Sequence, residues 1–579
     1  MSDESAFGSG SSRWVGGAAA RDGWGRRQGI HSPEDRRFVG LAAAALDDYL
    51  ARNPVTATLT GDARFDARLP DYTADGVAEQ VRVLNRHLLA LDSISPLGLS
   101  RINAVDLGIL RRRLTGRVYE LRTLDEPRWN PLWWSPALAL EPLFARSRPD
   151  VDSILARLGD LADFLEAARH SLTTMPRPHL QRALGELRAT PSWLLGAVAQ
   201  LAEAEPSAAP LLHDAAANAA AALEEHSYWL AARIPRATRD PRLGARRYAD
   251  VLELLVGTPL TAEEIKERAD AELEELQEQM RSLASQLLGR SMATRRLVPE
   301  ALAVVARDYR LTEGDLVAAA ARSVAAARAF TVEHRLVSVP DFAVEVVAMP
   351  PVRSGSVAAF IETPGVLAGN PASTRVAVGG PEPEWSASRR ESFLREYNAL
   401  MWDALMAHQA VPGHALQAAH ARSAPAPTAI RAVFPDLLFT EGWAGYAQDL
   451  LMQQGYRGSV ADAPPAAFAL QQVKLRMRGV ANALLDIGFH TEDMDEPQAR
   501  RLVATAAMAE EGEFVVKWRR VQTSAGTLTS YFLGHRLVAD LIGDVQARNP
   551  AWPLRQVHDR VLMHGSVPPE GARDLLGIL

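Results

Sequence analysis

The 579-residue chain contains no cysteine. Disulfide frameworks, thiolate zinc fingers, iron-sulfur clusters and cysteine nucleophiles are therefore excluded, and any metal must bind through histidine and carboxylate. Lysine is scarce as well: only Lys266, Lys474 and Lys517 occur, so nearly all of the basic charge is arginine. No apolar run reaches the roughly 18 residues of a membrane span, so we expect no membrane partner.

A concentrated positive face is also lacking. The chain has 63 Lys and Arg against 70 Asp and Glu, with a net charge of -7 and a pI near 6.1. Because the phosphate backbone of nucleic acid attracts clustered positive charge, we expect no nucleic-acid partner. Residues 1–35 lack the apolar segment of a signal peptide and are predicted to form a disordered leader. From this we expect a cytoplasmic protein.

The dominant pattern in the chain is helical. Between Thr261 and Gly289, a capping box of Thr261 and Glu264 precedes apolar residues that recur every three or four positions. The Glu-rich part of this helix, 263–278, is interpreted as a solvated face. Further helices are predicted near 36–53, 74–93, 99–124, 150–172, 178–203, 208–232, 297–335 and through most of 465–579.

Strand patterning is confined to one stretch, where Phe342–Met349, Val357–Thr363 and Arg375–Gly379 are rich in β-branched residues and divided by Pro and Gly. We therefore predict a mostly α fold, a multi-helix scaffold around a deep cleft with one small β-sheet. A helical domain over 36–339 would wall the cleft, and residues 340–579 would carry the site. No clear linker separates the two.

A helix is predicted to follow the sheet, with a capping box of Ser388 and Glu391 and an apolar face that continues to His408. The segment from His408 to His414 resembles the two-histidine zinc helix of metallopeptidases, but its spacing differs. Histidines four apart lie about 40° apart around a helix, whereas six apart is about 240°. Pro412 and Gly413 disrupt regular helix, so a bulge of about two residues would return His414 to the side of His408.

The residue after the first histidine also differs. Position 409 is Gln, where the hydrolytic motif carries Glu as the general base that takes a proton from the attacking water. An amide cannot accept that proton. Farther along, Pro435 and Asp436 begin a helix that carries Glu441 among apolar and aromatic neighbours, and a carboxylate in such surroundings favours a cation. Two histidines and one glutamate form the ligand set of catalytic zinc of the thermolysin type.

With these motifs the chain resembles the bacterial domain-of-unknown-function family 885, which is grouped with the gluzincin metallopeptidases and distantly similar to Taq-type carboxypeptidases. The family pattern is HExxPGH followed by EGWAxYxE. Here these segments read HQAVPGH, from His408 to His414, and EGWAGYAQ, from Glu441 to Gln448. The likeness extends through Leu46–Asp66, Arg247–Met280, Val337–Pro351 and Tyr531–Gly534.

The resemblance implies a helical metallopeptidase-like scaffold with one zinc ion. It places His408 and His414 at the histidine ligand positions, Glu441 at the carboxylate position, and Tyr531 as a stabiliser of the tetrahedral intermediate. Gln409 and Gln448 depart from the family pattern, because both positions typically carry Glu. Loss of general-base help alone would cost about 10²- to 10⁴-fold in rate. Asp449, His420 and His535 are candidates for a replacement base.

Each assignment has a structural alternative. The two histidines could be packed helix residues bonded to a carbonyl, and Glu441 could pair with an arginine or help to start its helix. Gln409 is either a lost base or a polar substrate contact, and Tyr531 is otherwise a core aromatic. Five residues are more typical of structural roles: Arg536 in an ion pair, Gln417 and His420 on a helix surface or behind the metal ligands, and Trp133 with Trp134 in packing.

Two functions remain open. The first is a zinc-dependent, metallopeptidase-like hydrolase acting on a peptide or peptide-like amide. The second is a non-catalytic pseudoenzyme that binds a peptide or small metabolite in the same cleft. Neither a GxSxG elbow, nor a Walker loop, nor a GxGxxG after a strand is present, which argues against serine hydrolase, P-loop and Rossmann chemistry.

Overall fold

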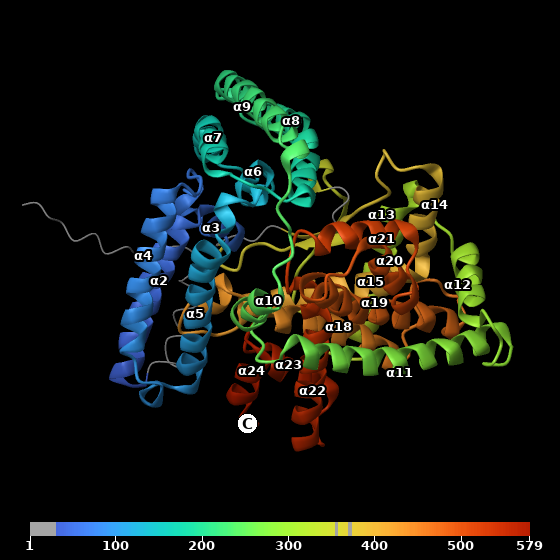
Figure 1. Ribbon diagram of the computed structural model, residues 1–579. Helices are drawn as coiled ribbons and strands as arrows, with labels where there is room; N and C mark the ends of the chain where they lie inside the picture. The colour runs from blue at the N-terminus through green and yellow to red at the C-terminus, as the bar shows by residue number, and fades with distance from the viewer. Residues whose placement is uncertain (1–30, 147, 354–356, 369–372, 579) are drawn as a thin grey trace, which may run out of the picture.

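The computed structural model describes residues 31–578 except 147, 354–356 and 369–372. Most of the predicted leader lies outside the described residues, but α2 begins at Pro33 with Ser32 as its cap, so the leader ends before residue 35. The described chain is mostly helical and carries one three-stranded sheet (Figure 1), which confirms the predicted fold class. Within this part of the chain, no helix is both long and apolar enough to cross a bilayer.

The first helices stand side by side at one end of the molecule (Figure 1). The Ser32 side chain and the Asp35 carboxylate close a capping box at the start of α2, and Phe38 and Leu46 are buried on its inner face. This face shares a hydrophobic core with Trp443 and Val538 of the C-terminal half. The elements are α2 (Pro33–Arg52), α3 (Pro54–Thr60), α4 (Ala74–Asp92) and α5 (Arg101–Tyr119).

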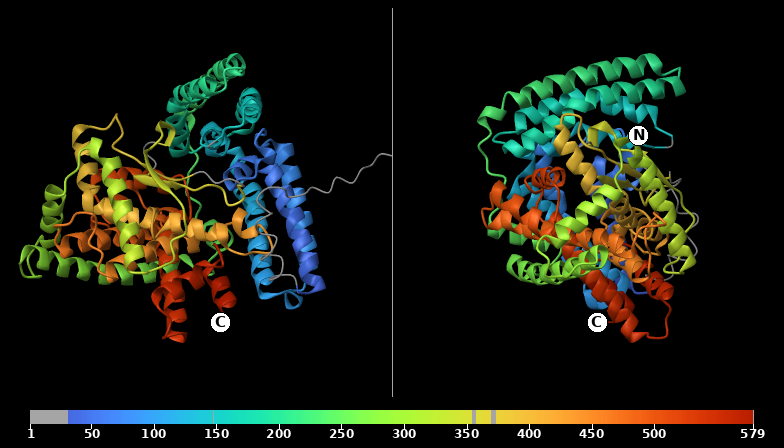
Figure 2. Two further views of the ribbon diagram at one scale, coloured as in Figure 1. Left: turned by 180° about the vertical axis from the view of Figure 1, so that it is seen from behind. Right: turned by 90° about the vertical axis from the view of Figure 1, so that its right-hand side faces the viewer.

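The next four helices form a second layer with a core of its own, built around Leu158, Leu194 and Leu223. Figure 2 shows the two longest, α8 and α9, running antiparallel along one edge of the molecule. The elements are α6 (Pro136–Phe144), α7 (Val151–Ser171), α8 (Arg177–Ala204) and α9 (Ala209–Ala231).

The following helices wrap the body that holds the sheet. The predicted helix over 297–335 is in fact two, because the Thr312–Asp315 capping box starts a new helix after residue 308. The predicted capping box of Thr261 and Glu264 is present, and its helix packs along α19. The elements are α10 (Ala245–Val251), α11 (Ala262–Leu288), α12 (Leu297–Asp308) and α13 (Leu316–Glu333).

The sheet has the order β1-β3-β2, with β1 (Val344–Ala348), β2 (Ala359–Glu362) and β3 (Thr374–Val378). β3 pairs in parallel with β1, where Val346 faces Val376, and antiparallel with β2, where Ile361 faces Val376. Val376 and Val378 are buried against Met401 and Met406 of the helix that carries His408. The sheet therefore packs against the helix that carries His408.

The C-terminal half is built around the 27-residue helix α19, which is buried on nearly all sides. α18 and α22 lie against it and against each other. The elements are α14 (Ala387–Glu396), α15 (Ala399–Gln409), α16 (His414–Ser423), α17 (Ile430–Val433), α18 (Leu437–Gln453), α19 (Pro465–Thr491), α20 (Glu496–Ala506), α21 (Glu511–Val521), α22 (Thr527–Arg548), α23 (Leu554–Leu562) and α24 (Pro569–Leu576).

The prediction of one helix from Ser388 to His408 is wrong. Ser386, not Ser388, caps α14, and this helix ends at Glu396. Asn398 starts α15 by accepting a hydrogen bond from the Met401 backbone N–H at 3.2 Å. Asn398 lies within the apolar stripe, so the apolar spacing continues through the point at which α14 ends and α15 begins. The division of the chain between residues 339 and 340 stays a prediction.

Candidate metal site and cavity

The two histidines lie on separate helices. α15 ends at Gln409 and α16 begins at His414, so the link is a break rather than the expected bulge within one helix. Gly413 makes the turn sterically feasible, because a Cβ there would lie 1.8 Å from the His408 carbonyl oxygen. The break brings the two imidazole rings to a centroid distance of 4.7 Å at right angles.

The break is held against α18 by Trp443, whose indole N–H donates to the Pro412 carbonyl at 2.8 Å in a fully buried setting. α18 in turn packs closely on α22. A Cβ on Gly442 would lie 2.3 Å from the Gly534 carbonyl oxygen, and a Cβ on Gly534 would lie 2.4 Å from that of Leu438. These glycines allow α18 and α22 to approach closely, which fixes the position of Glu441, next to Gly442, opposite the histidines.

His408, His414 and Glu441 converge. One ligand atom from each of the three lies within 4.8 Å of the others, and they are the metal-capable cluster found among the described residues. Glu441 Oε2 lies 3.6 Å from His408 Nε2 and 3.4 Å from His414 Nε2. Two ligand atoms about 2.0 to 2.2 Å from a tetrahedral zinc lie about 3.3 to 3.6 Å from each other, so both distances suit a shared ion.

The hydrogen bonding of the Glu441 carboxylate is incomplete. Oε2 is buried and has no hydrogen-bond partner among the described residues. Burial alone would raise the pKa of Glu441, but His414 and His408 hold it below its ordinary value, so the group is ionised. A buried carboxylate oxygen without a protein donor favours a cation, so this donor set fits a divalent metal.

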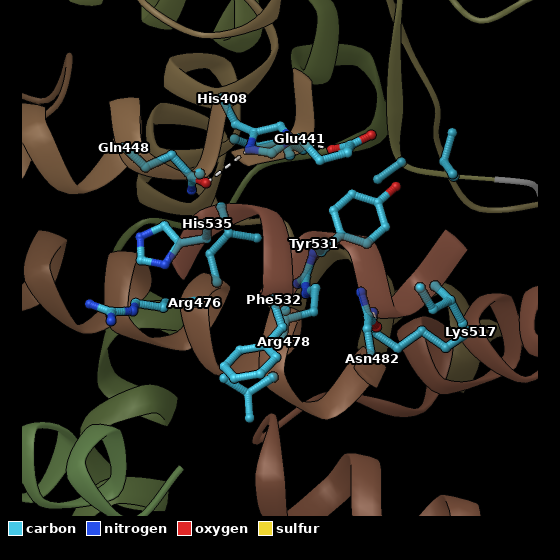
Figure 3. A pocket seen from close by; sticks show the side chains of 18 of the residues that line it. His408, Glu441, Gln448, Arg476, Arg478, Asn482, Lys517, Tyr531, Phe532 and His535 are labelled. Atoms are coloured by element: carbon cyan, nitrogen blue, oxygen red, sulfur yellow. Dashed lines mark hydrogen bonds and ion pairs between the residues drawn. The ribbon is translucent and has the colours of Figure 1, made fainter. Parts of the chain in front are cut away.

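His408 is oriented by Gln448. Its Nδ1 lies 2.9 Å from Gln448 Oε1, one of the contacts drawn in Figure 3. An amide oxygen only accepts, so Nδ1 carries the proton and Nε2 is left with a free lone pair toward Glu441. Burial, with a contribution from His414, lowers the pKa of His408, which favours the neutral form that binds metals.

A cavity of about 1100 Å³, including its open mouth, adjoins the cluster. His408, Gln409 and Glu441 line it at one side, and α19, α21 and α22 supply most of the remaining wall (Figure 3). Of the predicted N-terminal domain, only Glu272 on α11 reaches this lining among the described residues. Glu272 was expected to be solvated, but it is 5% exposed and pairs with Arg476 at 2.8 Å.

Tyr531 and Gln409 both face the cavity. The Tyr531 hydroxyl accepts a hydrogen bond from Arg520 Nη2 at 2.7 Å. Burial and the charge of Glu441 raise the pKa of Tyr531, so its phenol keeps its proton at neutral pH. Gln409 makes no hydrogen bond with another described residue through its side chain, which leaves both its donor and its acceptor directed at solvent or a ligand.

The candidates for a replacement base are engaged elsewhere. Asp449 Oδ2 lies 2.9 Å from His535 Nε2 and 3.0 Å from Arg476 Nη1, and these contacts lower the pKa of Asp449 although burial opposes them. His420 lies outside the cavity lining, with its Nε2 2.7 Å from the Ser338 carbonyl oxygen. None of the three is a free base.

The remaining candidates are structural. Gln417 donates to Ser566 Oγ at 2.7 Å, and Arg536 lies 3.5 Å from Glu272, as its interpretation as an ion pair predicts. Trp134 is buried in the core of α6–α9, and Trp133 stacks under Arg117 at 4.4 Å. The tryptophans are packing residues and do not line the cavity.

Two cavity residues escaped the sequence reasoning. Gln472 on α19 is 3% exposed and leaves both side-chain polar atoms without a partner among the described residues. Arg520 on α21 is the other. Neither belongs to a motif, and the fold alone brings them beside the histidine helix, so no local signal could have identified them.

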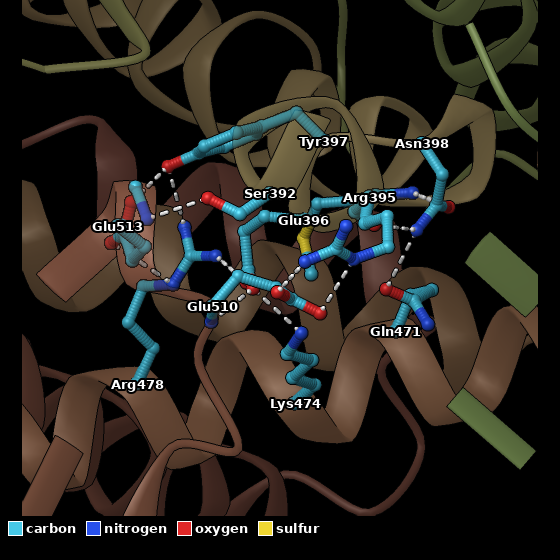
Figure 4. A network of polar contacts seen from close by, with 12 residues as sticks. Ser392, Arg395, Glu396, Tyr397, Asn398, Gln471, Lys474, Arg478, Glu510 and Glu513 are labelled. Atoms are coloured by element: carbon cyan, nitrogen blue, oxygen red, sulfur yellow. Dashed lines mark hydrogen bonds and ion pairs between the residues drawn. The ribbon is translucent and has the colours of Figure 1, made fainter. Parts of the chain in front are cut away.

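Next to the cavity, Glu396 stands at the centre of a buried network (Figure 4). Its carboxylate accepts hydrogen bonds from Lys474 at 2.8 Å, Arg478 at 2.6 Å and the Glu510 backbone N–H at 3.0 Å. Although burial opposes ionisation, these partners lower the pKa of Glu396 to about 2.

Fold and site together define a mostly helical protein in which two histidines and a glutamate meet beside a buried cavity. The chain belongs to the bacterial family of proteins of unknown function DUF885, whose model matches residues 54–576. None of the curated proteins compared with the chain matches it.

Two solved structures share this fold. One is described as "a putative lipoprotein of unknown function" from Shewanella oneidensis, with a TM-score of 0.75 and 22% identity over 93% of this chain and 99% of the other. The second is described as "the putative lipoprotein" from Colwellia psychrerythraea, with a TM-score of 0.77 and 17% identity over 94% of this chain and 98% of the other.

These comparisons contradict the predicted cytoplasmic location, because both structures are described as lipoproteins. Lipoproteins are anchored to membranes by covalently attached lipid. The prediction rested on the lack of an apolar leader, and the residues of a folded domain do not report the compartment in which it works.

Proposed function

We propose that His408, His414 and Glu441 bind one zinc ion and that the adjoining cavity receives a peptide or peptide-like amide, in the manner of a gluzincin metallopeptidase. One observation carries this proposal: the buried Glu441 Oε2 has no protein donor and lies 3.4 and 3.6 Å from the two histidine Nε2 atoms. With no cysteine in the chain, a zinc site has to use histidine and carboxylate ligands, as these three residues do.

A zinc ion in this place would act as a Lewis acid toward the carbonyl of a bound amide. The chain supplies the surroundings. Gln448 fixes the His408 ring, and the protonated Tyr531 hydroxyl, held by Arg520, is a donor to an amide oxygen in the cavity. Gln409 can bond a substrate but cannot take a proton.

Metal analysis tests the proposal directly. The purified full-length protein should retain one zinc per chain after dialysis, and Glu441→Gln and His408→Ala should each lose it. His420→Ala is the matched control, because that imidazole bonds a backbone carbonyl away from the cluster. Unchanged zinc content in both site variants would refute the proposal.

A second candidate function is a pseudoenzyme that binds its ligand without cleaving it. It is favoured by Gln409 and by the pairing of every other carboxylate in the described lining: Glu272 with Arg476, Asp449 with His535, and Glu513 with Lys517 and Arg478. No lining carboxylate is left as a base.

Gln409→Glu separates the two functions. If peptidase activity on a peptide mixture rises from none, the native protein is a binding protein with an intact zinc site. If an existing activity falls, the native protein is an enzyme adapted to the amide. Restoring general-base help is worth about 10²- to 10⁴-fold in rate, so either change is large enough to measure.

A further inference from the structure

The basic side chains of Arg478, Lys517 and Arg520 lie in the cavity wall at α19 and α21. Lys517 is 6% exposed, and its ammonium shares Glu513 with Arg478, at 3.3 and 3.4 Å. Arg478 and Lys474 also share Glu396. Arg520, on the same helix as Lys517, is a further cation of the cavity wall. The charged groups of this cluster are Lys474, Arg478, Lys517, Arg520, Glu396 and Glu513.

Arg520 is the member of this cluster that has no carboxylate partner. It faces the cavity, and no carboxylate of the described residues forms an ion pair with its guanidinium, which bonds the Tyr531 hydroxyl. Its described contact is the Tyr531 hydroxyl, while Glu441 and Asp486 act on it at longer range. A guanidinium has five N–H donors in a planar fork that matches a carboxylate, and the bond to Tyr531 uses one of them.

The neighbouring cations also act on Lys517. Burial, and then the charges of Arg478 and Arg520 against the pull of Glu513, lower its pKa to about 8. A bound anion would relieve this repulsion.

Gln472 provides a second, independent feature of the same cavity. Its side chain is 3% exposed and lines the cavity, yet neither Nε2 nor Oε1 has a partner among the described residues. A buried amide with both groups unpaired is costly unless a ligand bonds it, and a peptide group offers the complementary acceptor and donor.

Two polar residues of α19 show how far the cavity extends along this helix. Gln472 and Asn482 lie ten residues apart on α19 and both line the cavity, so they are about 15 Å apart along the helix axis. An extended chain spans at most about 3.3 to 3.6 Å per residue, so this length corresponds to about four residues.

We infer that the cavity selects short peptides or peptide-like acids with a free carboxylate, which binds Arg520, while Gln472 bonds an amide group of the same ligand. This inference rests on the proposed function for the class of ligand, but the recognition is by the protein alone and does not need the metal. Arg520 is thus a specificity-determining residue.

The test compares an equimolar mixture of tetrapeptides that have free C-terminal carboxylates with the same mixture amidated at the C-terminus. The full-length protein, with zinc and after EDTA treatment, is examined by native mass spectrometry, and the retained peptides are measured by calorimetry. We expect free-acid peptides to bind at least about tenfold more tightly. Equal retention of both mixtures, or retention of neither, overturns the inference.

Substitutions of Arg520 test whether this residue binds the carboxylate of the peptide. Arg520→Gln should weaken binding of the retained peptides about 10- to 100-fold, and Arg520→Lys should weaken it less, since the charge stays but the planar fork is lost. Arg519→Gln is the matched control, because the neighbouring side chain is 50% exposed and pairs with Glu382. An unchanged affinity in Arg520→Gln overturns the inference. If Arg520→Gln does not fold, Arg520→Lys and the amidated mixture still decide.

Zinc content measured in the same samples keeps this result separate from the proposed function. A protein that holds zinc but does not distinguish acid from amide refutes only the carboxylate site. A protein that prefers acids but holds no zinc refutes only the metal site.

Discussion

Glu396 is fully buried behind the cavity wall, whereas Glu441 lines the cavity and is 15% exposed, and the surroundings of the two carboxylates differ (Figures 3 and 4). Glu396 receives three strong donors from Lys474, Arg478 and a backbone N–H, and its bonding is complete. Glu441 faces two histidines at 3.4 and 3.6 Å and keeps an unpaired Oε2. One carboxylate is neutralised by cations of the chain, and the other keeps an oxygen without a donor among the described residues.

This contrast distinguishes Glu396, a carboxylate in a structural ion pair, from Glu441, a carboxylate in a candidate binding site. Burying a carboxylate costs several kcal/mol, and the cost is offset only when donors surround it. A chain that can neutralise Glu396 so fully could do the same for Glu441. That it offers two imidazoles instead, one of them turned by Gln448, argues for function rather than for packing.

The largest expected effect is that of Glu396→Gln on stability. The substitution leaves Lys474 and Arg478 buried with too little negative charge, and we expect the free energy of unfolding to fall by about 3 to 5 kcal/mol. Denaturant unfolding measures it. Glu313→Gln, in an exposed pair with Arg390, is the control and should cost less than about 1 kcal/mol. Similar losses in both variants would show that burial does not set the difference.

Glu396 also predicts an acid dependence. Its pKa of about 2 in the folded protein lies below its ordinary value of 4.5, so its contribution is complete above pH 4.5 and is lost as pH falls toward 2. The stability difference between wild type and Glu396→Gln should narrow over this range. A constant difference would contradict the assigned pairing.

An intermediate effect is expected at Gln448. Gln448→Leu removes the acceptor that orients His408, and loss of such a contact typically weakens metal affinity about 10- to 100-fold. Zinc titration against a chelating indicator measures it. Gln453→Leu, at the exposed end of the same helix, should leave the affinity unchanged. Equal affinity in Gln448→Leu would mean that the ring is held by something else.

The smallest effect is expected when Glu441→Gln is compared with wild type in metal-free protein at pH 8. The lowered pKa of His408 makes that ring neutral there, so little favourable charge pairing is lost. We expect the free energy of unfolding to change by no more than about 1 kcal/mol. A loss as large as that of Glu396→Gln would make Glu441 a structural carboxylate and remove the contrast.

Local signals made much of the fold predictable. The helix from Thr261 to Gly289 follows from its capping box and spacing, and the three strands follow from their β-branched composition. The break at Asn398 was missed because a cap within a continuous apolar stripe is decided by packing against neighbouring helices. The burial of Glu272 likewise depends on how α11 packs on α19.

The site was predictable in part. His408, His414 and Glu441 belong to motifs, and the disruptive character of Pro412 and Gly413 gave the reason for their convergence. Arg520 and Gln472 carry no motif, since they approach the histidines from α21 and α19 only in the folded chain. Sequence spacing gives no access to such contacts.

One measurement tests the central claim most directly: anomalous diffraction at the zinc edge from crystals grown with equimolar zinc. A single strong peak about 2.0 to 2.2 Å from His408 Nε2, His414 Nε2 and a Glu441 oxygen is the predicted result. A peak elsewhere, or none at these three side chains, would contradict it.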